Sequence, residues 1–337
     1  MEDVYEENRV RRDIVGVDIG GTKCAVSLGR TMATSVDIIE RRSFPTPAGP
    51  ARAIEAILAA IAGLLADHGV ERVDAVGVSC GGPLDSAAGL VLSPPNLPGW
   101  DRVDVVAPLR DRFGVPVALQ NDANACALAE WTWGAGRGCR NMVFLTFGTG
   151  MGAGLILDGR LYEGTNGMAG EVGHARLAED GPVGYGKAGS FEGFCSGGGI
   201  ARLAQGMAEE RLRAGGAPLY CPTLEDLPRV TARSVGEAAE RGDPLALEVM
   251  GIVGRRLGQG LALLVDILNP ERIVIGSIYG RRRSLLEPIA LDELRREALP
   301  GALDVCHVVP AGLGERVGDL ASLSVALHAL DQERISP

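Results

Sequence analysis

The amino-acid sequence predicts an α/β protein of two domains. Two segments, 14–29 and 142–157, each consist of a β-rich run, a glycine-rich turn and a second β-rich run, so each predicts a hairpin. Short apolar strands and helical patterns alternate after both hairpins, as in α/β domains. The similar shape of the two segments indicates a duplicated unit. At roughly 150 residues per domain, the 337 residues also fit two domains.

The remaining elements are predicted in chain order. Apolar residues recur at helical spacing over 51–68, and Gly69 is placed to end that helix. The other predicted elements are strands at 73–80, 115–120, 272–276 and 304–309, and helices at 121–133, 243–268, 284–298 and 317–330. We divide the chain into an N-terminal domain, 1–135, and a C-terminal domain, 136–337, and expect the last helix to pack back on the first domain.

Three glycines recur at spacings of three and four within the predicted helix 243–268. They are Gly251, Gly254 and Gly258. Each glycine destabilises a helix interior by about 0.5–1 kcal/mol relative to alanine. We therefore expect another helix or a sheet to approach this face closely and to compensate.

Composition excludes several classes of partner. The net charge of −10 argues against nucleic acid, which needs a basic surface to neutralise its phosphates. An anionic substrate must therefore be met locally, by backbone amides or by a bound cation. Glycine supplies 48/337 residues, or 14%, and clusters with Thr and Asp at strand ends, which indicates tight turns and ligand loops.

The sequence predicts neither secretion nor membrane insertion. The N-terminal segment MEDVYEENRVRRD is charged, and no apolar run approaches the roughly 20 residues that span a bilayer. Seven cysteines stand at positions 24, 80, 126, 139, 195, 221 and 306. Their odd number and the lack of a CxxC pair indicate a reducing compartment. We therefore expect a cytoplasmic protein.

The turn of the first hairpin carries the first candidate motif, Asp18-Ile-Gly20-Gly21-Thr22-Lys23. Because the glycines have no side chains, backbone amides and the threonine hydroxyl can approach a phosphate closely. The adjacent aspartate can hold Mg²⁺ through water. A plain glycine-rich hairpin explains this motif equally well when it is taken alone.

The second hairpin repeats the motif as Gly148-Thr149-Gly150-Met151-Gly152. Two such loops, one per domain, are what a clamp on a triphosphate between two domains requires, so the pair is more specific than either member. A dinucleotide site fits poorly, because a strand rather than a helix follows the glycines.

Two further clusters place polar side chains at loops. Asn121-Asp122-Ala123-Asn124 follows a strand and opens a helix, and open α/β sheets bind ligands at such ends. A helix cap explains one of these polar residues but not three of four. Gly170-Glu171-Val172-Gly173-His174 contains the one histidine of four that lies in a glycine-rich loop beside a carboxylate.

These motifs, in this order, resemble the ROK family (repressors, uncharacterised reading frames and sugar kinases). The matching segments are DIGGTK, QNDANACALAE, FGTGMGAGLILDGRLYEGTNGMAGEVGH and, less well, VIGSIYG. They cover nearly the whole chain from about 13 to 329. The resemblance implies a two-domain actin-like fold (ribonuclease H-like and duplicated, as in hexokinases), with sugar and ATP bound in the cleft.

The resemblance also implies roles for single residues. Asp122 resembles the catalytic base that accepts the proton of the sugar hydroxyl. The implied sugar ligands are Gly82, Asn121, Asp122, Glu171, His174 and Glu192. The implied phosphate, metal and nucleotide positions are Asp18, Gly20, Gly21, Thr22, Lys23, Gly148, Thr149, Gly150 and Gly276. Carboxylates and amides suit a polyol, whose hydroxyls both donate and accept.

The chain departs from the family pattern where members carry a zinc knuckle, CxCGxxGCxE. Val183, Tyr185 and Ser190 replace its three cysteines, and Cys195 is a lone thiol beyond them. Of the expected ligands only His174 remains, so we expect no structural zinc. We expect Val183, Tyr185 and Phe191 to hold the loop by packing, and a hydroxyl of Tyr185 or Ser190, or a backbone carbonyl, to bond the His174 ring.

A second departure lies in the adenosine region, where Gly276-Ser277-Ile278-Tyr279 replaces a turn of bare glycines. Side chains are expected there in place of open backbone. This puts the nucleotide preference in question and motivates one alternative, a sugar-binding pseudokinase or sensor.

The resemblance predicts ATP-dependent phosphorylation of a hexose or N-acetylhexosamine, with glucose as the leading substrate and ATP and Mg²⁺ as cofactors. We also expect a homodimer and no nucleic-acid partner. A sugar-responsive repressor is the rival from another class. Only about thirteen residues precede the first phosphate loop, too few for a DNA-binding module, so we expect a kinase.

Overall fold

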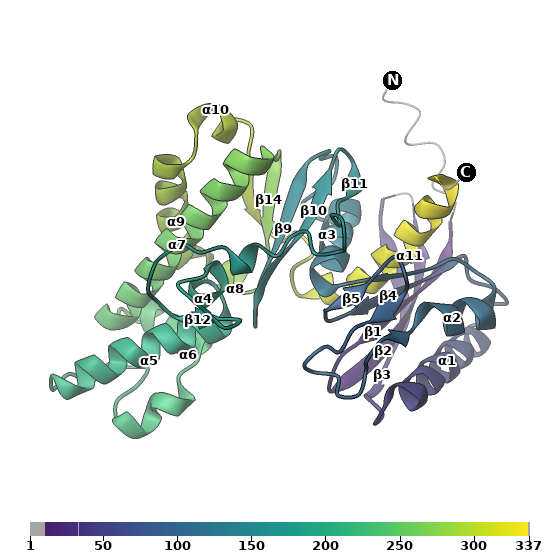
Figure 1. Ribbon diagram of the computed structural model, residues 1–337, viewed down its shortest axis with the longest axis horizontal. Helices are drawn as coiled ribbons and strands as arrows, with labels where there is room; N and C mark the ends of the chain where they lie inside the picture. Colours follow the sequence, from purple (N-terminus) through teal and green to yellow (C-terminus); the bar gives the residue numbers. More distant parts are fainter. Residues whose placement is uncertain (1–10, 33, 336–337) are drawn as a thin grey trace. The chain divides into compact units, whose positions relative to one another are not determined.

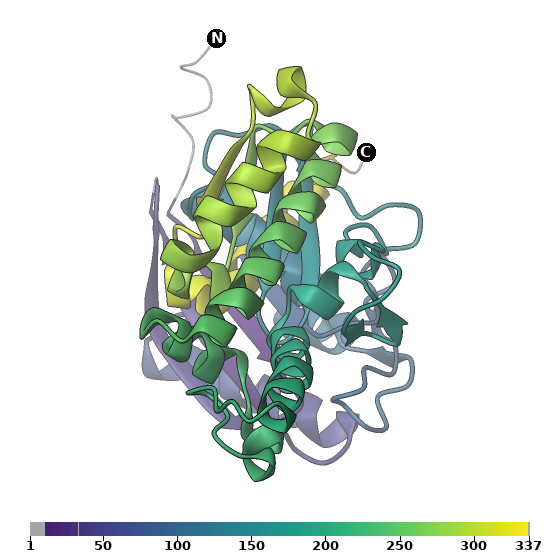
Figure 2. The ribbon, with the colours of Figure 1, turned by 90° about the vertical axis from the view of Figure 1, so that its left-hand side faces the viewer.

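The computed structural model describes residues 11–32 and 34–335, and it divides into two compact units. Unit 1 takes in the described residues up to Gly138, the segment Glu163–Met168 and the described residues from position 315 onward. Unit 2 consists of Cys139–Tyr162 and Ala169–Gly314. Figures 1 and 2 show the elements of each unit. The charged N-terminal segment 1–10 lies outside the described residues.

A five-stranded sheet organises unit 1, with the strand order β3-β2-β1-β4-β8. Strands β1, β2 and β3 form antiparallel pairs, whereas β4 is parallel to β1 and β8 is parallel to β4. The strands are β1 (Asp13–Ile19), β2 (Lys23–Thr31), β3 (Val36–Pro45), β4 (Ala75–Cys80) and β8 (Val117–Gln120).

Helices cover both faces of this sheet. Helices α3 (Asp122–Trp133) and α11 (Val317–Ile335) contact each other and β4, while α1 (Pro50–Asp67) and α2 (Val106–Phe113) contact β2 and β8 (Figure 1). A smaller antiparallel sheet follows β4 and consists of β5 (Leu84–Asp85), β6 (Leu90–Val91) and β7 (Val103–Asp104).

Unit 2 repeats the same sheet, with the strand order β11-β10-β9-β14-β15. Its strands are β9 (Met142–Phe147), β10 (Met151–Leu157), β11 (Arg160–Leu161), β14 (Arg272–Ile275) and β15 (His307–Pro310). Numbered along the chain within each unit, both sheets have the order third, second, first, fourth, fifth. This equal order, with an antiparallel hairpin followed by parallel strands, confirms the predicted duplication.

Helices and short hairpins complete unit 2. The helices are α4 (Phe191–Phe194), α5 (Gly197–Arg213), α6 (Ala232–Glu240), α7 (Pro244–Leu268), α8 (Ile278–Arg281), α9 (Arg283–Glu297) and α10 (Pro300–Leu303). Strands β12 (Val183–Gly184) and β13 (Lys187–Ala188) pair as a hairpin, and the 3₁₀ turns are η1 (Val172–His174), η2 (Leu224–Arg229) and, at the link to α11, η3 (Gly314–Arg316). None of the helices in the described residues is long and apolar enough to cross a membrane.

The glycines of α7 permit the expected close helix packing. A β-carbon at Gly254 would lie 2.9 Å from Ile289, and one at Gly258 would lie 2.5 Å from the carbonyl oxygen of Ala290, both on α9. The expectation is confirmed for these two positions. It is wrong for Gly251, whose nearest neighbour is the Arg255 side chain at 3.6 Å.

Most predicted elements are present within one or two residues, with two instructive differences. The last strand begins at His307 rather than at residue 304, because β15 pairs only with the four residues of β14. Strand β3 was not predicted, because its sequence VDIIERRSFP lacks apolar alternation. As an edge strand it is stabilised by its pairing with β2, and charged side chains on an edge also oppose aggregation.

Two neighbouring glycines let α11 lie directly on the sheet of unit 1. Gly16 of β1 and Gly77 of β4 face each other in the parallel register. A β-carbon at Gly77 would overlap the backbone of Ser322 and Ala326, and one at Gly16 would lie 2.9 Å from the backbone nitrogen of Leu323. Backbone atoms cannot move aside as a flexible side chain can, so glycine is required at both positions.

We predict that Gly77→Ala lowers the free energy of unfolding by at least about 1–3 kcal/mol, the usual effect of overpacking. Urea denaturation measures this change. Gly206→Ala is the matched control: it lies in α5 with no atom within 4 Å of its β-carbon position, so it should stabilise slightly through helix propensity. Equal stability of Gly77→Ala and the native protein would contradict the packing account.

Candidate active site

The first phosphate loop is the turn between β1 and β2. Gly21, Thr22 and Lys23 are exposed there, and the Gly20 nitrogen donates to the Lys23 carbonyl oxygen at 3.1 Å. A β-carbon at Gly21 would overlap Asn96, so the turn can be this tight only with glycine. The turn therefore leaves its backbone exposed.

Asp18 and Asp122 form a pair of carboxylates in unit 1. Asp18 lies beside Ser79 in the parallel register of β1 and β4, and the Ser79 hydroxyl donates to Asp122 Oδ1 at 3.1 Å. Burial, and then the charge of Asp122, raise the pKa of Asp18 to about 6. The Asp122 side chain is open to solvent, yet desolvation by the surrounding protein raises its pKa, and the Ser79 hydrogen bond opposes that rise.

The start of α3 fixes Asp122. Asn121 is the N-cap, and its Oδ1 accepts from the Asn124 nitrogen at 2.8 Å. Gly81 leaves room beside the carboxylate, since a β-carbon there would lie 3.8 Å from Asp122 Oδ2. The sequence analysis missed Ser79, because a serine in the apolar strand β4 gave no signal before its neighbour across the sheet was known.

The second phosphate loop joins β9 to β10 and is held by two segments of unit 2. The Gly197 nitrogen, at the start of α5, donates to the Gly148 carbonyl oxygen at 2.7 Å. The Met151 nitrogen donates to Glu192 Oε2 at 3.1 Å. Glu192, predicted from the resemblance as a sugar ligand, therefore also fixes the end of the phosphate loop. Thr149 remains exposed.

The segment with Glu171 and His174 lies against β10. The Ala153 nitrogen donates to the Gly170 carbonyl oxygen at 2.9 Å, and η1 follows. The side chains of Glu171 and His174 are exposed, and the His174 ring lies edge-on to the Tyr185 ring with centroids 6.5 Å apart. Unit 2 thus brings these two candidates and Glu192 together with the second phosphate loop.

The segment where family members carry a zinc knuckle corrects one expectation. Val183 and Tyr185 are exposed by 46% and 79%, so neither holds the loop by packing. Phe191 is buried as expected. Within the described residues, no group of three or more His, Cys, Asp or Glu side chains is placed to hold a metal ion.

The fully buried Ser190 hydroxyl organises this loop. It donates to the Lys187 carbonyl oxygen at 3.1 Å and accepts from the Gly193 nitrogen at 3.1 Å as the N-cap of α4. Those bonds join the β12–β13 hairpin to the helix that carries Glu192. The hydroxyl therefore bonds the loop backbone and not the His174 ring, which corrects one of the partners that we considered.

The predicted adenosine region differs from the expectation at Tyr279, whereas the side chains of Ser277 and Ile278 lie near Gly148 and Gly197. Tyr279 is fully buried, and its hydroxyl donates to Glu287 at 3.1 Å, so its side chain does not obstruct the turn. Ser277 has φ of 57°, a conformation that normally favours glycine. The backbone after Gly276 therefore keeps a glycine-like shape although the glycines are replaced.

Comparison with known families identifies the chain. The ROK family matches residues 14–327. The chain belongs to the ROK family. A glucokinase of Halalkalibacterium halodurans is 34% identical to this ROK protein, over 90% of this chain and 92% of the glucokinase. The DNA-binding transcriptional repressor Mlc of Escherichia coli is 31% identical over 68% of this chain, but this covers 55% of the repressor.

Solved ROK structures match the fold along nearly the whole chain. A ROK hexokinase from Thermus thermophilus has a TM-score of 0.76 and 30% identity, covering 95% of this chain and 99% of the hexokinase. A ROK family glucokinase from Streptomyces griseus, solved in complex with glucose and AMPPNP, has a TM-score of 0.71 and 31% identity, covering 94% of this chain and 99% of the glucokinase. The predicted two-domain actin-like α/β fold of sugar kinases is confirmed.

We predict that Asp18 titrates near pH 6 and that Asp122→Asn lowers this pKa without returning it to the ordinary value. The substitution removes one like charge, but burial, the larger cause, remains. Carbon NMR of labelled aspartates measures both values. Asp13 of the same strand is the internal control, because its hydrogen bond to Arg30 lowers its pKa. An unchanged titration of Asp18 in Asp122→Asn would show that the two carboxylates do not interact.

Proposed function

We propose that this ROK protein is an ATP-dependent sugar kinase that transfers the γ-phosphoryl group of ATP to a hydroxyl of a hexose or an N-acetylhexosamine, with glucose as the leading substrate. Similarity to glucokinases over most of the chain, one of them solved with glucose and AMPPNP, supports this function. The observation that carries it is the solvent-accessible carboxylate of Asp122, positioned by Ser79 and the start of α3 beside Asp18.

Asp122 accepts the proton of the attacking sugar hydroxyl. Ser79 holds Oδ1, and the bare backbone of Gly81 leaves space next to Oδ2, so this oxygen faces the hydroxyl. A base works best when its pKa approaches the working pH, and desolvation moves the pKa of Asp122 in that direction. Phosphoryl transfer has a loose transition state, so the remaining residues act by positioning and by electrostatic stabilisation.

The two glycine-rich loops hold the phosphates of the nucleotide in this proposal. Their exposed backbone amides and the hydroxyls of Thr22 and Thr149 supply donors without a bulky side chain. Magnesium bound with the nucleotide neutralises charge on the transferring group. We assign Asp18 to hold it, because a nearby cation stabilises the ionised form of a carboxylate whose pKa burial has raised.

Several polar groups are proposed to bind the sugar hydroxyls. Asn121 uses Oδ1 as the helix cap and keeps its amide nitrogen for the sugar. Glu192 uses Oε2 for the Met151 nitrogen, and Oε1 has no hydrogen-bond partner among the described residues. Exposed Glu171 and His174 complete the set, with the Gly82 backbone. We further propose the domains 1–135 and 136–337, with the segment Glu163–Met168 and the last helix, from position 315 onward, grouped with the first.

The pseudokinase alternative was motivated by the altered adenosine turn. The buried Tyr279 and the glycine-like backbone of Ser277 remove that motive, so the active kinase is the better-supported function. The homodimer and the cytoplasmic location stay predictions, and light scattering of the purified protein tests the first.

We propose that the protein needs no structural zinc, because Val183, Tyr185 and Ser190 lack the thiolates of such a site and the Ser190 hydroxyl already bonds the loop. Elemental analysis of protein purified without a metal-affinity tag should give far less than one zinc per chain. Stoichiometric zinc that survives dialysis against a chelator would refute this proposal.

We predict that Asp122→Asn lowers kcat by about 10²–10⁴ and leaves the sugar dissociation constant within about tenfold, since the substitution removes the base but keeps the size of the side chain. Coupled detection of ADP across hexoses and N-acetylhexosamines measures turnover, and calorimetry measures sugar binding. Asp111→Asn on α2 is the control for a general loss of charge and should change neither value. Near-normal kcat in Asp122→Asn would rule out Asp122 as the base.

A further inference from the structure

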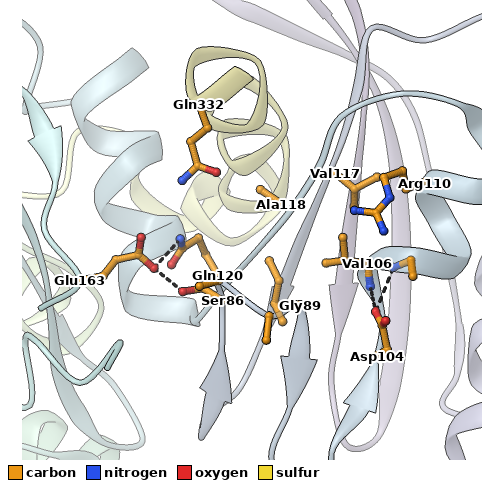
Figure 3. A pocket seen from close by; sticks show the side chains of 14 residues that line it. Ser86, Gly89, Asp104, Val106, Arg110, Val117, Ala118, Gln120, Glu163 and Gln332 are labelled. Atoms are coloured by element: carbon orange, nitrogen blue, oxygen red, sulfur yellow. Dashed lines mark hydrogen bonds between the residues drawn. The ribbon is translucent and has the colours of Figure 1, made fainter. Parts of the chain in front are cut away.

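A cavity lies wholly within unit 1, and the proposed reaction does not use it. Its volume is about 360 Å³, at the lower end of the range of small-molecule sites. Four parts of the unit form its walls: the β5–β6 turn, α2, strand β8, and Glu163 with Gln332 (Figure 3). The lining side chains and backbone are Ser86–Gly89, Asp104, Val106, Ala107, Arg110, Val117–Gln120, Glu163 and Gln332.

The free edge of β8 lines this cavity. β8 is the last strand of its sheet, and the Val76 nitrogen of β4 donates to the Pro116 carbonyl oxygen. Alternate residues of a parallel strand face the same neighbour, so Val117 and Leu119 turn their N–H and C=O groups away from β4. Within the described part of the chain these groups have no hydrogen-bond partner. Leu119 is only 1% exposed, so its polar backbone needs either water or a ligand in the cavity.

Charged groups at the rim determine which ligand fits. Arg110 makes no ion pair among the described residues. Asp104 is committed to the start of α2, where its Oδ1 accepts from the nitrogens of Val106 and Ala107. The charges of Arg110, Asp104 and Glu163 sum to −1, which disfavours binding of an anion.

Glu163 connects the cavity to the proposed base. Its Oε1 accepts from the Ser86 hydroxyl and from Gln120 Nε2, the latter at 3.0 Å (Figure 3). Gln120 Oε1 in turn accepts from Asn124 Nδ2 at 3.0 Å, and the Asn124 backbone nitrogen donates to Asn121 Oδ1. Three consecutive hydrogen bonds therefore lead from Glu163 to Asn121, the neighbour of Asp122.

The direction of these bonds is set by the carboxylate. An ionised carboxylate only accepts, so Gln120 must turn its NH₂ group toward Glu163 and its oxygen toward Asn124. Asn124 then donates its own NH₂, and its Oδ1 is buried without a partner. An unsatisfied buried acceptor costs about 1–3 kcal/mol. Glu163 thus fixes the orientation of both amide groups, although this orientation leaves Asn124 Oδ1 without a hydrogen-bond partner among the described residues. A ligand that hydrogen-bonds to Glu163 therefore affects the orientation of the same two amides.

We propose that this cavity is a second binding site, separate from the kinase site, for a small neutral polyhydroxylated molecule of about monosaccharide size. Its hydroxyls donate to Glu163 and to the Leu119 carbonyl oxygen, and accept from Arg110 and the Leu119 N–H. Occupancy of the site alters the hydrogen bonds from Glu163 through Gln120 and Asn124 to Asn121, and so changes how Asn121 meets the sugar in the kinase site.

Binding is measured in the Glu171→Ala/His174→Ala background, which removes two of the proposed sugar ligands of the kinase site and leaves unit 1 unchanged. The probes are D-glucose and D-sorbitol, with glucose 6-phosphate as the anionic comparison. We expect both neutral probes to bind by calorimetry and to slow hydrogen exchange of the Leu119 amide. No binding of either neutral probe, or tighter binding of the phosphate, overturns the proposal.

Paired variants locate the binding. Arg110→Gln removes a charged donor and should weaken binding by about tenfold or more. Ala107→Leu fills the cavity with a helix-compatible side chain and should abolish binding. Arg112→Gln on the same helix and Ala59→Leu on α1 are the matched controls, because neither residue lines the cavity. Equal effects of Arg110→Gln and Arg112→Gln would show that the probe binds elsewhere.

The connection to Asn121 has its own readout. Sorbitol at saturation should change the KM for the sugar substrate in the native protein and leave it unchanged in Gln120→Leu, which removes the first two of the three hydrogen bonds. If saturating sorbitol left the KM of the native protein unchanged, the connection would be overturned. This last measurement rests on the proposed kinase activity, whereas the binding measurements do not, so failure of the kinase function would not be mistaken for failure of the second site.

Discussion

Unit 1 depends on the direct contact between helix α11 and the sheet at Gly16 and Gly77. At Gly77 the strand lies directly against the helix backbone, and at Gly16 it lies against the Leu323 nitrogen and the Ser322 hydroxyl. In its turn α11 fixes α3, because the Ser324 hydroxyl donates to the Ala125 carbonyl oxygen at 3.0 Å. Helix α3 carries Asp122 at its first turn. The position of the proposed base is therefore linked to the packing of α11 on the sheet.

In unit 2 a buried hydroxyl helps to position one of the proposed site residues. The Ser190 hydroxyl joins the β12–β13 hairpin to α4, and α4 places Glu192 against the Met151 nitrogen. One carboxylate thus holds the end of the proposed phosphate loop, and we propose that its second oxygen binds a sugar hydroxyl. The loop backbone supplies the hydrogen-bond partners of this buried hydroxyl.

The sequence predicted the features that depend on local pattern, and it could not predict those that depend on partners distant in the chain. Hairpins with Gly-Gly-Thr turns and the capped start of α3 are visible in a few adjacent residues. The role of Ser79 becomes visible only when β1 and β4 are aligned. The charged strand β3 can be recognised only from its pairing with β2. The expectation for Val183 failed because an apolar side chain in a short hairpin need not face the core.

The central claim is that this ROK protein transfers the γ-phosphoryl group of ATP to a sugar hydroxyl. Mass spectrometry of the sugar after reaction with ATP labelled with ¹⁸O in the γ-phosphoryl group tests it most directly. The account predicts a hexose phosphate that carries the labelled phosphoryl oxygens, formed in step with ADP. Label found only in inorganic phosphate, with the sugar unmodified, would contradict the account, because ATP would then be hydrolysed without transfer.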